Sequence, residues 1–202
     1  MTDIGIEYRF ADNLELRAFG ERLLPLLREA FTELRTQADG ESIYGYALGL
    51  HESGNWISLH LGTEEGLKRV AKDYGGDPGR AATTLRWAYW DWPHMLPASD
   101  NVDLNALDGE ITVWLDRNRP DWDGTGEPDT SYFEALADMY ISVLRQLDSE
   151  GFFCPPDVRE YIAVQFTVGP MGEAEEAVYL KALNPPDVFG RVLAEIQAGY
   201  VS

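Results

Sequence analysis

The chain contains few of the residues that support disulfide formation, metal binding or thiol chemistry. Its 202 residues include three histidines and a single cysteine, Cys154. One cysteine excludes an internal disulfide, which suits a reducing compartment, and we therefore expect the protein to be cytoplasmic. The first ten residues, MTDIGIEYRF, carry acids where a secretory signal needs a basic and an apolar segment. No run approaches the roughly 18 consecutive apolar residues that a membrane-spanning helix requires.

Basic residues are also scarce. The chain has 16 lysines and arginines against 35 aspartates and glutamates, which gives a formal net charge of −19. A chain of this charge is repelled by phosphate groups, so we predict no binding to nucleic acid and none to a membrane surface. The same charge favours association with a basic protein. The hydrophobic content of 45% is enough for a sizeable core, and the length predicts one domain over residues 1–202.

Two short motifs suggest chemistry that their surroundings do not support. DWDGT, residues 121–125, spells the signature of haloacid-dehalogenase-like phosphatases, but Asp121 follows the charged segment DRNRP instead of a buried strand. Counted from Asp121 as a calcium-binding loop, the twelfth position is Tyr132, where a bidentate glutamate is needed. Cys154 stands among aromatic residues and prolines in GFFCPPDV, without a neighbour that would activate its thiol. The sequence therefore predicts no catalytic residue, no metal site and no cofactor.

The clearest structural pattern is a β-hairpin over about residues 42–62. The runs SIYGYALGLH and NWISLHLG are strand-like, and the glycine-containing loop ESGN separates them. With His51 opposite Trp56, one face of the hairpin carries six large side chains that we assign to the core: Tyr46, Leu48, Leu50, Ile57, Leu59 and Leu61. The other face carries small residues that let another element approach closely: Gly45, Ala47, Gly49 and Ser58. His51 and His60 share that face but lie about 13 Å apart, too far for one metal ion.

Apolar residues at steps of three and four predict helices along the rest of the chain. The first covers about residues 14–36, with Asp12 or Asn13 as its cap, and Pro25 predicts a kink or two abutting helices. Further helices are predicted over 63–74, 103–118, 130–148, 173–183 and 186–197, although AVYLKAL (177–183) could be a strand. DPGRAATT (77–84) and RPDWDGTGEPD (119–129) are predicted loops, and about 159–168 is a predicted strand. These elements predict an α+β fold, in which helices pack against a small, mainly antiparallel sheet.

The segment RWAYWDWPH, residues 86–94, holds three of the six tryptophans. Trp87 follows Leu85 in alternation and is predicted to be a core residue. If a helical turn begins near Tyr89, Trp90 and Trp92 cannot both stay on the face of Trp87, so at least one should be partly exposed. We expect most of these rings to lie in the core. The candidates for binding a partner are Trp90, Asp91 and Trp92, together with Trp122 in the acidic loop.

Several of these segments resemble one bacterial protein family. They are the N-terminal helix, the YGYAL strand, the second strand that leads into TEEGL, the LRW segment followed by a further tryptophan, and LKALNPPDVFGRVL near the end. In this order they resemble the family known as domain of unknown function 4303. The resemblance extends over nearly the whole chain and implies an α+β domain, with no established reaction and no catalytic residues to transfer.

At the level of fold, the chain is also similar to small acidic immunity proteins of bacterial toxin systems, including the SUKH-type group. That similarity implies a domain that binds another protein, for instance a basic toxin that it neutralises, without catalysis. The alternative is an enzyme that acts on a small molecule, or a ligand-binding domain. Because folds host unrelated functions, the analogy identifies neither a partner nor a substrate.

Overall fold

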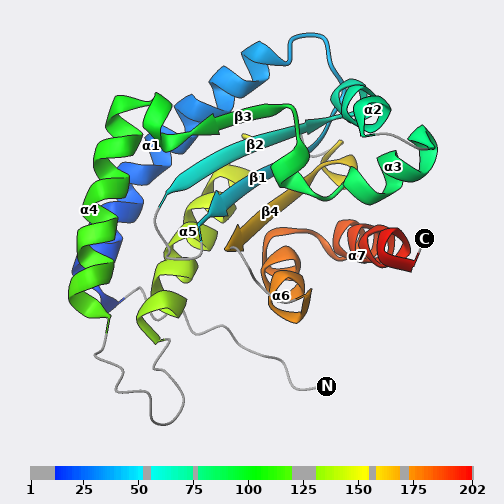
Figure 1. Cartoon of the computed structure of the whole chain (residues 1–202). Coiled ribbons are helices and arrows are strands. Elements are labelled where there is room, and N and C mark those ends of the chain that lie inside the picture. Colours follow the sequence, from blue (N-terminus) through cyan, green and yellow to red (C-terminus); the bar gives the residue numbers. More distant parts are fainter. Residues whose placement is uncertain are drawn as a thin grey trace.

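The centre of the fold is a four-stranded sheet. The computed structural model describes residues 12–51, 56–74, 77–119, 131–154, 158–168 and 173–201. Strands β1 (Ile43–Leu50), β2 (Ile57–Thr63), β3 (His94–Pro97) and β4 (Ala163–Val168) are arranged in the order β3-β2-β1-β4 (Figure 1). β1 and β3 are antiparallel to β2, whereas β4 is parallel to β1. The predicted α+β fold is confirmed, and its sheet is mixed because of the one parallel pair.

The register of the central hairpin is the predicted one. Tyr46 pairs with Leu61, Leu48 with Leu59, and Leu50 with Ile57. All six side chains are buried in one hydrophobic cluster with the helices of that face. A shift by one residue would move these side chains to the opposite face, so their burial fixes the register.

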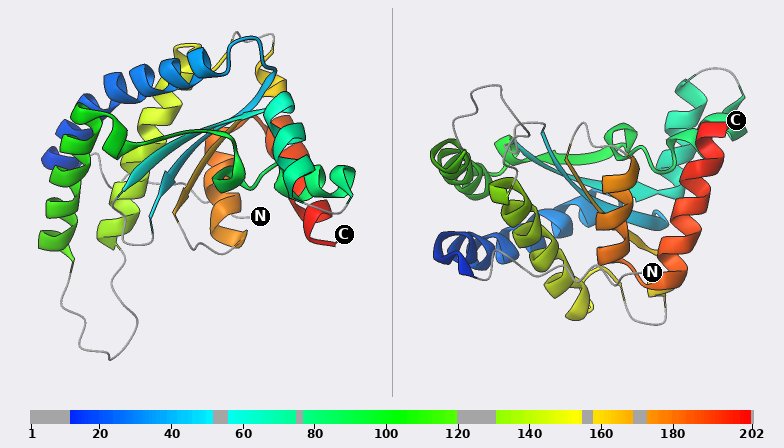
Figure 2. Two further views of the ribbon diagram at one scale, coloured as in Figure 1. Left: turned by 45° about the horizontal axis from the view of Figure 1, so that its top comes forward. Right: turned by 90° about the horizontal axis from the view of Figure 1, so that it is seen from below.

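Three long helices cover this face of the sheet: α1 (Leu14–Gln37), α4 (Val102–Asn118) and α5 (Ser131–Ser149) (Figure 2). Asn13 begins α1, because its side-chain oxygen accepts hydrogen bonds from the backbone N–H groups of Glu15 and Leu16. Helix α1 continues through Pro25, so the alternative of two abutting helices is wrong. A proline removes one backbone hydrogen bond, and the buried leucines on both sides of Pro25 hold the helix on the core.

The other face is covered by α2 (Glu64–Asp73), α3 (Pro78–Leu85) and α7 (Pro186–Val201), with α6 (Glu173–Leu183) beside β4 (Figure 2). Thr63 caps α2, because its hydroxyl oxygen accepts a hydrogen bond from the Gly66 N–H. The predicted loop DPGRAATT is instead helix α3, capped by Asp77 and started by Pro78. This helix buries only Ala81 and Leu85, too few positions to give a visible periodicity. AVYLKAL is helical and belongs to α6. No helix in the described ranges is both long and apolar enough to cross a membrane.

Two strand boundaries differ from expectation. β3 was not predicted, because four residues bounded by Pro93 and Pro97 carry too little alternation to stand out. The strand expected over 159–168 is shorter, since residues 159–161 form a 3-10 turn before β4.

The outer edge of β4 is closed by a side chain. The Asn184 carboxamide oxygen accepts a hydrogen bond from the Val164 N–H (2.8 Å), and its nitrogen donates to the Val164 carbonyl (2.7 Å). The same nitrogen also donates to the Leu180 carbonyl. The amide thus takes the place of a neighbouring strand at this point, which gives the Asn of the LNPP segment a structural role.

Candidate functional site

The tryptophan segment lies on the small-residue face of the sheet. A Cβ atom built on Gly45 would stand 2.8 Å from the Cη2 atom of Trp92, and one on Gly49 would stand 2.9 Å from the Cε2 atom of Tyr89. Gly62 is equally crowded by the ring of Tyr44. The glycines that give the hairpin its small face are therefore the places where aromatic rings rest directly on the backbone.

A 3-10 turn over Tyr89–Asp91 decides which of these rings point inward. Tyr89 and Trp92 are buried, and the indole N–H of Trp92 donates to the Arg86 carbonyl at 3.0 Å. Trp92 is only 5% exposed, so it is a core residue and not the partner-binding candidate that the sequence suggested. Trp87 is buried as predicted. Trp122 lies outside the described residues.

Trp90 is the exposed tryptophan of the segment. Its side chain is 47% exposed, while its ring packs against Tyr89 (centroids 4.5 Å apart) and edge-on to His60 (5.2 Å). Asp91 is exposed next to it in the turn. Met95, also exposed, pairs with His60 across β2 and β3, so its side chain lies on the same face of the sheet as the imidazole. We call these three residues, Trp90, Asp91 and Met95, the Trp90 surface. Met95 was missed because it depends on the unpredicted strand β3.

His60 supports the Trp90 surface from below. It is completely buried, its Nε2 atom lies 2.9 Å from the Ser58 hydroxyl, and the ring of Tyr89 stands edge-on to it at 5.0 Å. Burial lowers the pKa of His60 to about 4, so the imidazole is neutral at pH 7. Among the described residues, its Nδ1 atom has no hydrogen-bond partner of normal geometry.

Ser58 and His60 are within the distance of a nucleophile and its general base, but they lack the other parts of such a site. Both are covered by protein, and no described carboxylate orients the imidazole through Nδ1. Two further buried groups of this face, the Tyr89 hydroxyl near Thr167 and the Gln165 amide nitrogen, also have no hydrogen-bond partner of normal geometry within the described ranges. Ser58, His60, Tyr89 and Gln165 therefore form a polar cluster beneath the Trp90 surface. Protein atoms cover this cluster, so a substrate cannot contact it in this structure.

The third histidine belongs to an ionic cluster at the beginning of β3. The Glu41 carboxylate accepts hydrogen bonds from Arg69 (2.6 Å), the Thr63 hydroxyl (2.5 Å) and His94 (2.9 Å). The hydrogen bond from Arg69, helped by those from Thr63 and His94, lowers the pKa of Glu41 to about 2. These residues join β3 to the end of β2 and the loop before β1, which is a structural role. In the described part of the chain, no three His, Cys, Asp or Glu side chains are arranged to hold a metal ion.

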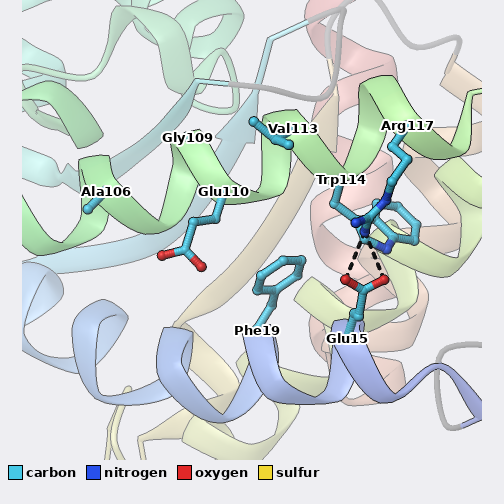
Figure 3. A pocket seen from close by; sticks show the side chains of 8 residues that line it. All are labelled: Glu15, Phe19, Ala106, Gly109, Glu110, Val113, Trp114 and Arg117. Atoms are coloured by element: carbon cyan, nitrogen blue, oxygen red, sulfur yellow. Dashed lines mark hydrogen bonds and ion pairs between the residues drawn. The ribbon is translucent and has the colours of Figure 1, made fainter.

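A separate groove runs between α1 and α4 on the far side of the core. Its volume is about 470 Å³, and it is lined by the eight residues drawn in Figure 3: Glu15, Phe19, Ala106, Gly109, Glu110, Val113, Trp114 and Arg117. Two ion pairs join the helices along it, Glu15 with Arg117 and Arg22 with Glu110. No local sequence pattern indicates this groove, because it arises from the packing of two helices far apart in the chain.

Taken with its fold, the site defines an acidic α+β domain with helices on both faces of a small mixed sheet and with Trp90 exposed above its small-residue face. The family model described as Domain of unknown function (DUF4303) matches residues 23–185, and the chain belongs to this family. The match runs from within α1 to the LNP segment that closes the edge of β4, and α7 lies beyond it. Neither the comparison with curated proteins nor that with solved structures gives a match.

Proposed function

We propose that the protein is a non-catalytic, cytoplasmic protein-interaction domain that binds a basic protein through the Trp90 surface. The observation that carries the proposal is the state of Trp90, which is half exposed while its ring is held by Tyr89 and His60. A tryptophan fixed in this way loses little conformational freedom on binding and offers a large apolar contact. Tryptophan is enriched among the residues that dominate binding energy at protein interfaces.

The charge of the chain supports a basic partner. A net charge of −19 attracts a positively charged protein at a distance, and the exposed Asp91 follows Trp90 directly in the chain. A toxin that acts on nucleic acid is basic because its substrate is anionic. A protein with this charge would occupy the substrate surface of such a toxin, so we propose an immunity-type role in which binding excludes the substrate.

The test is to co-express the chain with the product of its neighbouring gene, to measure growth, and to determine the dissociation constant of any complex. Trp90→Ala should weaken binding by at least about tenfold, which corresponds to roughly 1.4 kcal/mol. Tyr161→Ala is the matched control, because Tyr161 is an exposed aromatic residue just before β4, at the opposite end of the sheet. Failure of the pair to associate even at low salt, or equal effects of the two substitutions, would contradict the proposal.

A second candidate function is the binding of a small polar ligand beneath Trp90, which requires the Trp90 ring to move aside because the groups below it are covered in this structure. It is favoured by three buried groups on one face of the sheet that have no hydrogen-bond partner of normal geometry in the described part of the chain: His60 Nδ1, the Tyr89 hydroxyl and the Gln165 amide nitrogen. Buried polar groups without partners each cost roughly 1–3 kcal/mol, which a ligand could recover. The test is a thermal-shift screen with small amides, alcohols and carboxylates. A stabilising compound whose effect disappears in Gln165→Leu would support this function, and no shift from any of them would count against it.

A further inference from the structure

Helix α4 has a second apolar stripe that faces away from the core. Its inner face is buried through Leu104, Leu107, Ile111, Trp114 and Leu115. On the outer side, Val102, Ala106, Gly109 and Val113 are all exposed, with Val102 84% and Val113 64% accessible. The spacing of four, three and four residues is the pattern by which one helix contacts another. Within the described structure, no element covers this stripe.

Three residues of the stripe, Ala106, Gly109 and Val113, form one wall of the groove between α1 and α4. Figure 3 shows Ala106, Gly109 and Val113 along α4, with Phe19 rising from α1 below them. A Cβ atom on Gly109 would meet no atom within 4 Å, so the backbone there is open to close approach. Trp114 lines the groove, and its buried indole N–H has no hydrogen-bond partner among the described residues. This exposed apolar stripe has open space in front of it, so a second helix can pack against it.

We propose that the occupant is α4 of a second copy of this chain, packed antiparallel about a two-fold axis. The stripe is symmetric about its centre, since Val102 and Ala106 are separated by the same number of residues as Gly109 and Val113. In an antiparallel pair, Val102 therefore lies opposite Val113 of the second copy, and Ala106 lies opposite its Gly109. The small residues meet at the centre, where two helix backbones come closest, and the valines pack at both ends.

The charges at the two ends of α4 favour the antiparallel direction. Asp100 and Asp103 stand at its beginning, while Arg117 and Arg119 stand at its end beside Asp116, and all five are exposed; Arg117 also pairs with Glu15 of α1. An antiparallel pair brings the acids of one copy near the arginines of the other, whereas a parallel pair would bring like charges together. The helix dipoles also oppose one another in the antiparallel arrangement. This interface is separate from the Trp90 surface, so a dimer leaves that surface free for a partner.

Sedimentation of the full chain at high micromolar concentration and physiological salt tests the proposal. The wild-type protein should sediment as a dimer, and Gly109→Arg should sediment as a monomer with unchanged far-UV circular dichroism, because the new side chain enters open space. Val178→Arg is the matched control, since Val178 is an exposed valine on α6, and it should remain dimeric. A monomeric wild type, or a dimer that persists in Gly109→Arg, would overturn the proposal.

Cross-linking determines the direction of the helices. Val102 and Val113 lie about 16 Å apart along one helix at ~1.5 Å per residue, so cysteines at both positions cannot bond within one chain. Under mild oxidation the variant V102C/V113C should form a covalent dimer, while each single variant should stay uncoupled because its two cysteines lie at opposite ends of the interface. The native Cys154 is buried and should not interfere. Equal cross-linking of the single variants would indicate a parallel pair, and none in the double variant would exclude this contact.

Discussion

Protonation of His60 should make the stability of the protein depend on pH between about 4 and 6.5. The imidazole is completely buried, and its pKa falls from the ordinary 6.5 to about 4 on folding. In this window the unfolded chain binds a proton that the folded chain does not, so the free energy of unfolding decreases as the pH falls. The stabilisation is fully present above pH 6.5 and is lost by about pH 4.

The magnitude follows from the shift in pKa. Each pKa unit is worth about 1.36 kcal/mol, so the change from 6.5 to about 4 corresponds to roughly 3 kcal/mol. That is a large part of the 5–15 kcal/mol or so by which a typical domain is stable. Glu41, whose pKa is lowered to about 2, contributes in a lower window, because its stabilisation is lost only as the pH falls below about 4.5.

The assay is urea denaturation at several pH values from 7 down to 4.5, followed by tryptophan fluorescence. His60→Gln removes the titrating group, so the difference in unfolding free energy between wild type and variant should change with pH across this window. His51→Gln is the matched control, because His51 is exposed and its replacement should leave the pH dependence of the wild type intact. Parallel curves for the wild type and His60→Gln would refute the reasoning, whatever the absolute stability of the variant.

Three further predictions concern stability and are measured by chemical denaturation. Leu59→Ala should lower the free energy of unfolding by about 2–5 kcal/mol, since Leu59 is completely buried in the core face of the hairpin. Asn184→Leu should cost at least about 2 kcal/mol, because the Val164 N–H and carbonyl at the edge of β4 lose their partners; an unchanged stability would show that Asn184 is not needed there. Gly45→Ala should destabilise by about 1–3 kcal/mol through its contact with Trp92, whereas Gly190→Ala in α7, which meets no atom, should stabilise by up to ~1 kcal/mol. The reverse order of the two glycine variants would contradict the packing described for the Trp90 segment.

The elements that could be predicted are those with many residues in one pattern. Helix α5 and the hairpin of β1 and β2 each show their periodicity over enough positions to be recognised, and the hairpin register followed from a single face of large side chains. Helix α3 and strand β3 were missed, because each buries only one or two apolar side chains. Helix α3 depends on capping by Asp77, and strand β3 depends on pairing with β2. Neither interaction produces a repeating pattern in the sequence.

The candidate site likewise combines features that the sequence predicts with features that depend on tertiary contacts. The sequence indicated that the tryptophan segment would divide between core and surface, but it offered Trp90 and Trp92 alike as partner-binding residues. The 3-10 turn decided between them by turning Trp92 onto Gly45 and leaving Trp90 outside. The support that His60 gives to Trp90 joins residues 30 positions apart, and such a contact has no local pattern in the sequence.

By itself, the sequence determined the α+β class, the two faces of the central hairpin, the acidic charge and the resemblance to the family. These properties depend on composition and on periodicities that repeat every two or three to four residues, so they can be recognised along the chain. The tertiary structure alone decided that β4 lies parallel to β1, that Trp90 is the exposed ring of the segment 86–94, and that α4 presents a second apolar stripe beside α1. Each of these depends on contacts between segments distant in the chain, where packing and the pairing of backbone groups select one arrangement among several that the local pattern allows.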